Sequence, residues 1–123
     1  MRREHSKLEL FNKLKIKDYD DEIINSAISK LAEQNYQSDE RFAEAFILMR
    51  FNQGKGPIKI ASELKLRGIS SFDLSDFDWF KSAKDIRRKK FGDNASIDFK
   101  EQAKQKRFLQ SRGFSLDQIN RSF

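Results

Sequence analysis

The sequence contains no cysteine, no valine and no threonine, and it has one histidine and one proline among its 123 residues. Without cysteine the chain can form neither a disulfide nor a thiolate metal site, and a single histidine excludes a site built from several histidines. The longest uninterrupted apolar run covers residues 45–49, far short of the roughly 20 residues that a membrane-spanning helix needs. We therefore expect no metal, no cofactor and no membrane contact, and a cytoplasmic location.

The residue types that are present favour helices. Leu, Ile and Phe together make up 33 of the 123 residues, and a charged chain with more than roughly 20% of such residues normally folds. Valine and threonine are strong strand formers, whereas the periodic stretches here are filled by Lys, Glu, Leu, Ala and Gln. The sequence predicts an all-α fold, and its length allows one compact domain or a short helical array.

Positive charge is concentrated in the last third of the chain. Residues 1–78 carry 13 Lys or Arg against 14 Asp or Glu, whereas residues 79–123 carry 12 against 5, a local net charge of +7. Four consecutive cations at 87–90 repel one another unless an anion joins them, so we predict an electrostatic contact with nucleic-acid phosphates or an acidic protein surface. An ordinary solvated helix face is the alternative. The candidate contact residues are Arg87, Arg88, Lys89, Lys90, Lys104, Lys106, Arg107 and Arg112.

Apolar residues recur at helical spacing along the whole chain, and capping residues separate the periodic segments. The segment 38–52 is apolar over most of its circumference, so we expect it to be central. Ser70 or Ser71 is expected to open a short acidic helix. The predicted helices cover residues 6–16, 21–34, 38–52, 57–67, this short segment, 78–91, 98–112 and 115 to the last residue.

Three stretches of the sequence superpose as a repeat. In each, a helix is followed by a turn whose first residue tolerates a left-handed backbone, then by an apolar residue and by a polar residue that caps the next helix. The turns begin at Asp18, Gly68 and Gly113, with spacings of 50 and 45 residues. Repetition at this length is typical of a helical array whose modules pack against their neighbours. The predicted three-helix repeats are 1–37, 38–78 and 79–123.

The first predicted repeat differs from the other two, because only five residues precede its first helix and a leading helix is therefore missing. We expect a chain that is truncated or starts late. A helix without this cover should be less buried, so we predict that Leu10 or Leu14 is more exposed than its counterparts Ile60 and Leu64.

Several of these stretches resemble one family. They are RREHSKLEL at 2–10, SDERFAEAF at 38–46, GKGPIKIASELKLRGIS at 54–70, KKFG at 89–92 and RFLQSRGFS at 107–115. Their order and spacing hold over nearly the entire chain, and in them the chain resembles the RecX family of bacterial regulatory proteins that bind the RecA recombinase. The chain departs from the family pattern in lacking the opening helix and in having Asp18 where a glycine is usual.

The resemblance implies tandem three-helix repeats that form an elongated, curved helical array lying in the groove of the RecA–DNA filament. It also implies inhibition of the ATPase, strand-exchange and co-protease activities of RecA in recombination, DNA repair and the SOS response. Single- or double-stranded DNA is expected to bind through the basic third repeat. We expect a monomer that is not an enzyme.

The residues themselves leave a rival function open, that of a basic helical nucleic-acid-binding protein independent of RecA. Sequence-specific helix-turn-helix recognition is disfavoured, because the helices that would enter the major groove begin with acidic or neutral residues. Catalysis is disfavoured because His5 is the only imidazole and because residues 54–57 are typical of a helix-start loop. Most aromatic residues are expected in the core, but Phe51 and Phe99 lie outside the apolar stripes and are candidate exposed anchors for a protein partner.

Overall fold

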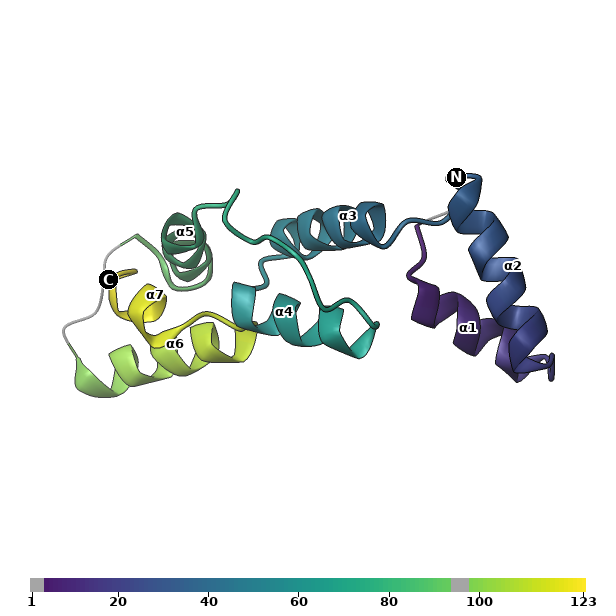
Figure 1. Ribbon diagram of the computed structural model, residues 1–123. Coiled ribbons are helices and arrows are strands. Elements are labelled where there is room, and N and C mark those ends of the chain that lie inside the picture. The colour runs from purple at the N-terminus through teal and green to yellow at the C-terminus, as the bar shows by residue number, and fades with distance from the viewer. Residues whose placement is uncertain (1–3, 94–97) are drawn as a thin grey trace. The chain divides into compact units, whose positions relative to one another are not determined.

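The computed structural model describes residues 4–93 and 98–123, and within them the regular structure is entirely helical (Figure 1). The helices are α1 (Lys7–Ile16), α2 (Asp21–Glu33), α3 (Asp39–Asn52), α4 (Pro57–Leu66), α5 (Trp79–Phe91), α6 (Phe99–Arg112) and α7 (Leu116–Asn120). The predicted all-α fold is confirmed. Each of these helices begins within one residue of its predicted start.

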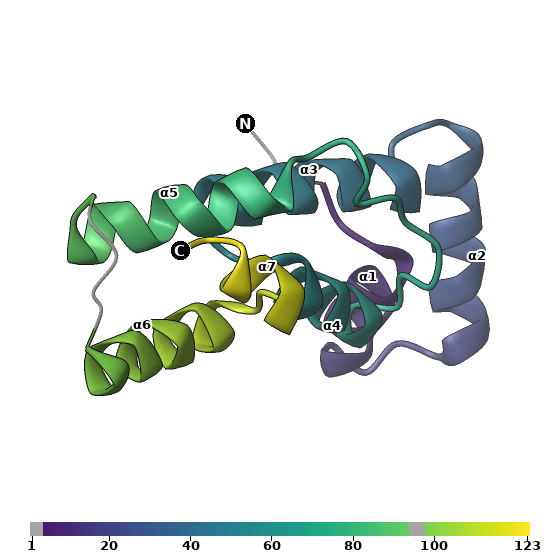
Figure 2. The same cartoon turned by 90° about the vertical axis from the view of Figure 1, so that its left-hand side faces the viewer.

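The chain divides into two compact units, Met1–Leu48 with Glu63–Phe72, and Met49–Ser62 with Asp73–Phe123. In the first unit α1 packs on α2 (Figure 1). In the second, α5, α6 and α7 all pack on one another, as Figures 1 and 2 show from two sides. The buried apolar residues of the first unit are Ile24, Ile28, Phe42, Ala43, Phe46, Ile47, Leu64 and Ile69, and those of the second are Ile60, Trp79, Ala83, Leu109, Phe114 and Ile119.

Polar side chains start the helices as the sequence predicts. The Ser6 hydroxyl accepts the Glu9 N–H at 3.1 Å, and the Glu9 carboxylate accepts the Ser6 N–H at 3.2 Å. Ser115 and Gln118 form the same reciprocal pair at the start of α7. Such caps satisfy backbone donors that have no partner inside the helix, and each contributes about 1 kcal/mol. Single side-chain caps come from Ser38, Asp78 and Asp98.

The three repeat turns have the backbone that the superposition predicts. The φ angles are 68° at Asp18, 82° at Gly68 and 99° at Gly113, all in the left-handed region. Aspartate is one of the few residues with a side chain that enter this region readily, which explains how it replaces glycine in the first turn. The apolar residue after the turn is buried in the second and third repeats, at Ile69 and Phe114.

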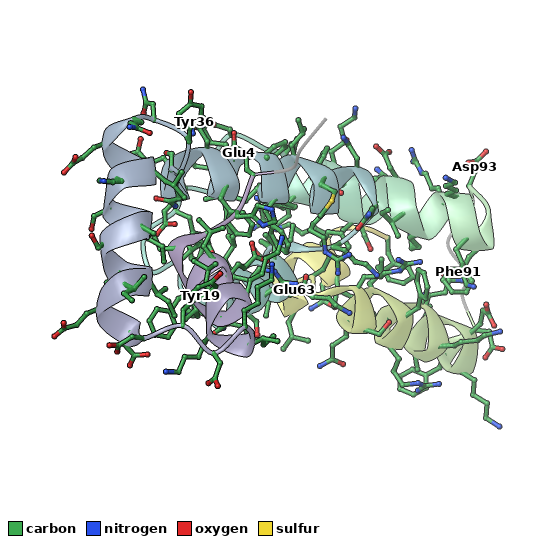
Figure 3. The ribbon with its side chains drawn as sticks, turned by 90° about the vertical axis from the view of Figure 1, so that its right-hand side faces the viewer. Glu4, Tyr19, Tyr36, Glu63, Phe91 and Asp93 are labelled. Carbon is green, nitrogen blue, oxygen red and sulfur yellow. The ribbon has the colours of Figure 1, made fainter. Side chains whose placement is uncertain are left out.

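The first repeat is the least buried. Tyr19 follows its turn and is 49% exposed, and Figure 3 shows it just beyond α1. No residue of α1 is fully buried. Leu10 and Leu14 are both partly exposed, whereas Ile60 and Leu64 have no exposed surface. The predicted difference in burial is confirmed.

The prediction of a short acidic helix between α4 and α5 is wrong, because residues 69–78 form a loop. The Asp73 carboxylate accepts the hydroxyl and the backbone N–H of Ser75, at 2.6 and 2.8 Å, and these hydrogen bonds lower the pKa of Asp73. They stabilise a local turn in place of a helix. The Trp79 indole N–H donates to the Leu74 carbonyl at 2.7 Å and so takes up a backbone acceptor that a helix would use.

The segment 38–52 is expected to be central, and four side chains of α3 are buried, those of Phe42, Ala43, Phe46 and Ile47. Leu48 and Met49 are 51% and 47% exposed, so one side of the helix faces solvent. Phe51, predicted to be an exposed anchor, is instead partly buried against other aromatic rings. Its ring centroid lies 4.4 Å from that of Phe77 and 5.4 Å from that of Trp79.

Inside the second unit, the backbone before α4 binds the backbone at the end of α6. The Gly56 N–H donates to the Arg112 carbonyl at 2.7 Å, and the Ile58 N–H donates to the Gly113 carbonyl at 2.9 Å. We call this pair of hydrogen bonds the backbone clasp. A Cβ atom on Gly56 would lie 2.4 Å from the Gly113 carbonyl carbon, so the close approach requires a residue without a side chain.

We predict that Gly56→Ala lowers the free energy of unfolding by about 2–4 kcal/mol, because backbone atoms must move apart to admit the methyl group. Ser71→Ala is the control. Ser71 is exposed in the loop 69–78, so its truncation should change the free energy of unfolding by less than about 0.5 kcal/mol. Thermal melts followed by circular dichroism measure both variants, and equal losses would contradict a role for the close approach.

Candidate functional site

The run of four cations at 87–90 does not form one patch. Successive residues of a helix are separated by about 100° around its axis, so four in a row point in four directions. In α5, Arg87 points into the protein, whereas Arg88, Lys89 and Lys90 are exposed. These neighbours along the chain are therefore not neighbours on one surface of α5, and their mutual repulsion is weaker than the sequence predicts.

Arg87 is the predicted contact residue that the structure places in the interior. It is 1% exposed, its Nε donates to the Ser122 carbonyl at 2.8 Å, and its guanidinium carbon lies 5.0 Å from the Phe123 ring centroid. Burial lowers the pKa of Arg87, the positive charge of Arg88 lowers it further, and Asp93 opposes the shift. The assignment of Arg87 to the contact surface is therefore wrong, because its side chain holds the C-terminal segment against α5.

Two of the exposed cations in α5 meet a third from α6 at a surface hollow of about 320 Å³. We call it the basic hollow, and its lining residues are Asn52, Gln53, Gly54, Ile86, Lys89, Lys90, Phe108 and Arg112. They come from the end of α3 and the loop after it, the second half of α5 and the end of α6. All belong to the second unit.

An aromatic ring holds two of these cations. The Lys90 Nζ lies 5.0 Å from the Phe108 ring centroid, and the Arg112 guanidinium carbon lies 5.1 Å from the same centroid. Such cation–π contacts contribute about 0.5–1 kcal/mol each at exposed sites. Phe91, at the end of α5 in Figure 3, meets Phe108 edge to face with centroids 5.4 Å apart. The ring of Phe108 therefore has a fixed position and orients both cations.

The remaining predicted residues lie elsewhere on the surface of α5 and α6. Arg88, Lys104, Lys106 and Arg107 are exposed. The Lys106 Nζ lies 5.6 Å from the Phe123 ring centroid. Phe99, also on α6, is 84% exposed as predicted.

Ion pairs hold several cations of the first unit. Arg41 pairs with Glu4 at 3.0 Å and Lys15 with Asp21 at 2.6 Å. In the described part of residues 79–123, Arg121 pairs with Asp117 at 3.2 Å. The seven exposed or partly exposed candidate cations form no ion pair with a carboxylate of the described chain. Their combined field is available to an external anion.

Sequence reasoning missed several residues of the basic hollow. Phe108 was expected in the core, and Asn52 and Gln53 carried no signal because they belong to a different repeat from the cations they meet. The sequence does contain a signal that Arg87 is buried. In the predicted helix 78–91 it stands four residues after Ala83 and eight after Trp79, which places it on the apolar face.

Family models of three consecutive domains match the chain. They are described as the first, second and third three-helix domains of RecX, and they match residues 1–31, 38–75 and 76–122. The chain belongs to the RecX family. The repeat boundaries after residues 37 and 78 remain predictions.

Individual RecX proteins are similar to nearly the whole of this chain. A protein named regulatory protein RecX from Pseudomonas tolaasii is 39% identical over 98% of this chain and 81% of its own length. Another with this name, from Acinetobacter baylyi, is 39% identical over 96% of this chain and 77% of its own. The crystal structure of RecX from Lactobacillus salivarius superposes with a TM-score of 0.78 at 22% identity, covering 98% of this chain and 84% of that one, and shows a shared fold.

Among the described residues, no helix combines the length and apolarity needed to cross a membrane. In the same residues, no group of three or more histidine, aspartate or glutamate side chains is placed to hold a metal ion.

We predict that Arg87→Ala lowers the free energy of unfolding by about 2–4 kcal/mol, because it removes a charged hydrogen bond and a buried side chain. Arg88→Ala removes the same charge from an exposed position and should cost less than about 0.5 kcal/mol. Urea titration of both variants measures the difference. Similar stabilities for the two would show that the buried position of Arg87 does not contribute as described.

Proposed function

We propose that this RecX family member is a non-enzymatic regulator that binds RecA nucleoprotein filaments and modulates, mostly by inhibition, their ATPase, strand-exchange and co-protease activities. The observation that carries the proposal is the match of three consecutive RecX domain models over nearly the whole chain. Relatives that match nearly the whole of this chain are named regulatory proteins. We propose a cytoplasmic monomer as the acting form.

The electrostatics supply a reason for binding to a nucleoprotein filament. DNA is a dense line of negative charge, and a protein that neutralises its phosphates releases condensed counterions. The unpaired cations of α5 and α6 favour such contacts with single- or double-stranded DNA, or with an acidic protein surface beside it. The contact residues proposed for this are Arg88, Lys89, Lys90, Lys104, Lys106, Arg107 and Arg112.

Binding across neighbouring subunits of the filament would oppose the rearrangement that ATP turnover requires. This mechanism needs surface contact and no chemistry by the chain itself. The competing function is a nucleic-acid-binding protein that ignores RecA, which the same unpaired cations would also support. The two are separated by stoichiometry, because a filament regulator acts on RecA and a competitor acts on free DNA.

We predict inhibition of DNA-dependent ATP hydrolysis by RecA when the chain is present in far smaller amount than RecA. The measurement is steady-state ATP hydrolysis on single-stranded DNA at increasing amounts of the chain. If inhibition requires amounts comparable to the number of DNA sites, the chain is a DNA competitor and the proposal is wrong.

The charge contribution is tested by reversing Arg88, Lys89 and Lys90 to glutamate. We expect the concentration for half-maximal inhibition at about 50 mM salt to rise about tenfold, equivalent to about 1.4 kcal/mol. Reversal of the exposed Lys13, Lys17 and Lys30 makes the same change in net charge within the first unit. An equal loss for both triple variants would indicate a general effect of net charge and contradict a specific surface.

A further inference from the structure

We propose that the basic hollow binds a phosphodiester group of a nucleic-acid strand. It names a ligand for the basic hollow. It rests on the proposed function, because that function brings the chain to DNA. Its physical basis is the convergence of cations from two helices on a site that offers them no carboxylate.

The cations of the hollow are close enough to repel one another. Because Lys90 and Arg112 lie about 5 Å from one ring centroid, their charged groups are at most about 10 Å apart. This separation is about one Debye length at 0.1 M salt, so solvent ions screen the repulsion between the two charges only in part. Lys89 lines the same hollow. An anion seated there would relieve the repulsion among all three.

The helix ends do not neutralise these cations. A helix C-terminus carries roughly half a negative charge, so the ends of α3, α5 and α6 together supply about 1.5 charges against three. The end of α6 is further neutralised, because its Arg112 and Gly113 carbonyls already accept the N–H groups of Gly56 and Ile58. Dipole interaction explains why cations occur in a last turn. It does not explain why cations from two helices gather at one hollow.

The donors of the hollow suit a phosphate better than a carboxylate. A phosphodiester and a carboxylate each have two charged oxygens, but the phosphodiester adds two ester oxygens, and its four oxygens point in tetrahedral rather than planar directions. The lining supplies donors from several sides: two ammonium groups, one guanidinium and the amides of Asn52 and Gln53. The Gln53 Oε1 already accepts a hydrogen bond from Arg50 at 2.6 Å, so the amide group that remains is its NH₂ donor. These features favour a nucleic-acid strand over an acidic peptide.

The test measures binding of a fluorescent oligothymidylate of about 20 nucleotides, a length that covers at least one typical single-strand site, to the full chain without RecA. Lys90→Gln combined with Arg112→Gln should weaken binding about tenfold at about 50 mM salt and lower the salt slope by about 0.7, the value for one lost phosphate contact. The control combines Lys81→Gln with Lys100→Gln. Both control residues are exposed and lie outside the hollow, and the expected loss is less than about twofold.

Equal losses in the two double variants would overturn the proposal, as would no loss in either. Should the hollow variant unfold, Lys89→Gln replaces it, because Lys89 is exposed, and the slope should then fall by at most about 0.7. A polyglutamate peptide of equal charge that displaces the oligonucleotide at the same concentration would assign the hollow to a protein partner. Displacement by inorganic phosphate at the same low concentration would assign it to free phosphate. Either result overturns the proposal. RecA is absent throughout, so failure to inhibit RecA would contradict the proposed function without affecting this result.

Discussion

The second unit depends on the backbone clasp between the start of α4 and the end of α6. Two N–H groups that α4 cannot use internally find the two carbonyls that α6 leaves free, so each helix end satisfies the other. Only glycine permits the approach, since a Cβ atom on Gly56 would meet backbone. The clasp also fixes Arg112, whose side chain then reaches the Phe108 ring and the basic hollow. The absence of a side chain at Gly56 permits the close packing of α4 and α6, and this packing places the charge of Arg112 at the basic hollow.

The candidate cations of α5 and α6 differ from the paired cations of the first unit. Surface ion pairs contribute little stability, but they cancel local fields, as the Arg41 and Glu4 pair does in the first unit. The candidate cations of α5 and α6 lack such partners in the described chain, and aromatic rings position three of them, Lys90, Lys106 and Arg112. A ring orients a cation without neutralising it, so the charge stays available to a partner. This contrast links the composition of residues 79–123 to the proposed contact with a nucleoprotein filament.

Much of the fold could be predicted, because its signals are local. Caps such as Ser6 and Ser115 and the left-handed turns at Asp18, Gly68 and Gly113 depend on residues a few positions apart. The missing fifth helix could not be predicted in this way, since the hydrogen bonds of Asp73 and the packing around Trp79 override a capping signal. The site was predicted only in outline. Composition located the basic region, but helical geometry sent Arg87 inward, and the basic hollow needed residues from two predicted repeats.

In the proposed complex, the unpaired cations of α5 and α6 meet the filament. The most direct measurement is the rate at which an amine-reactive reagent modifies individual lysines, followed by mass spectrometry, with and without RecA assembled on single-stranded DNA. The account predicts that the filament protects Lys89, Lys90 and Lys104 while Lys13 and Lys30 react as fast as in the free chain. Unchanged reactivity at Lys89, Lys90 and Lys104, with protection confined to the first unit, would contradict it.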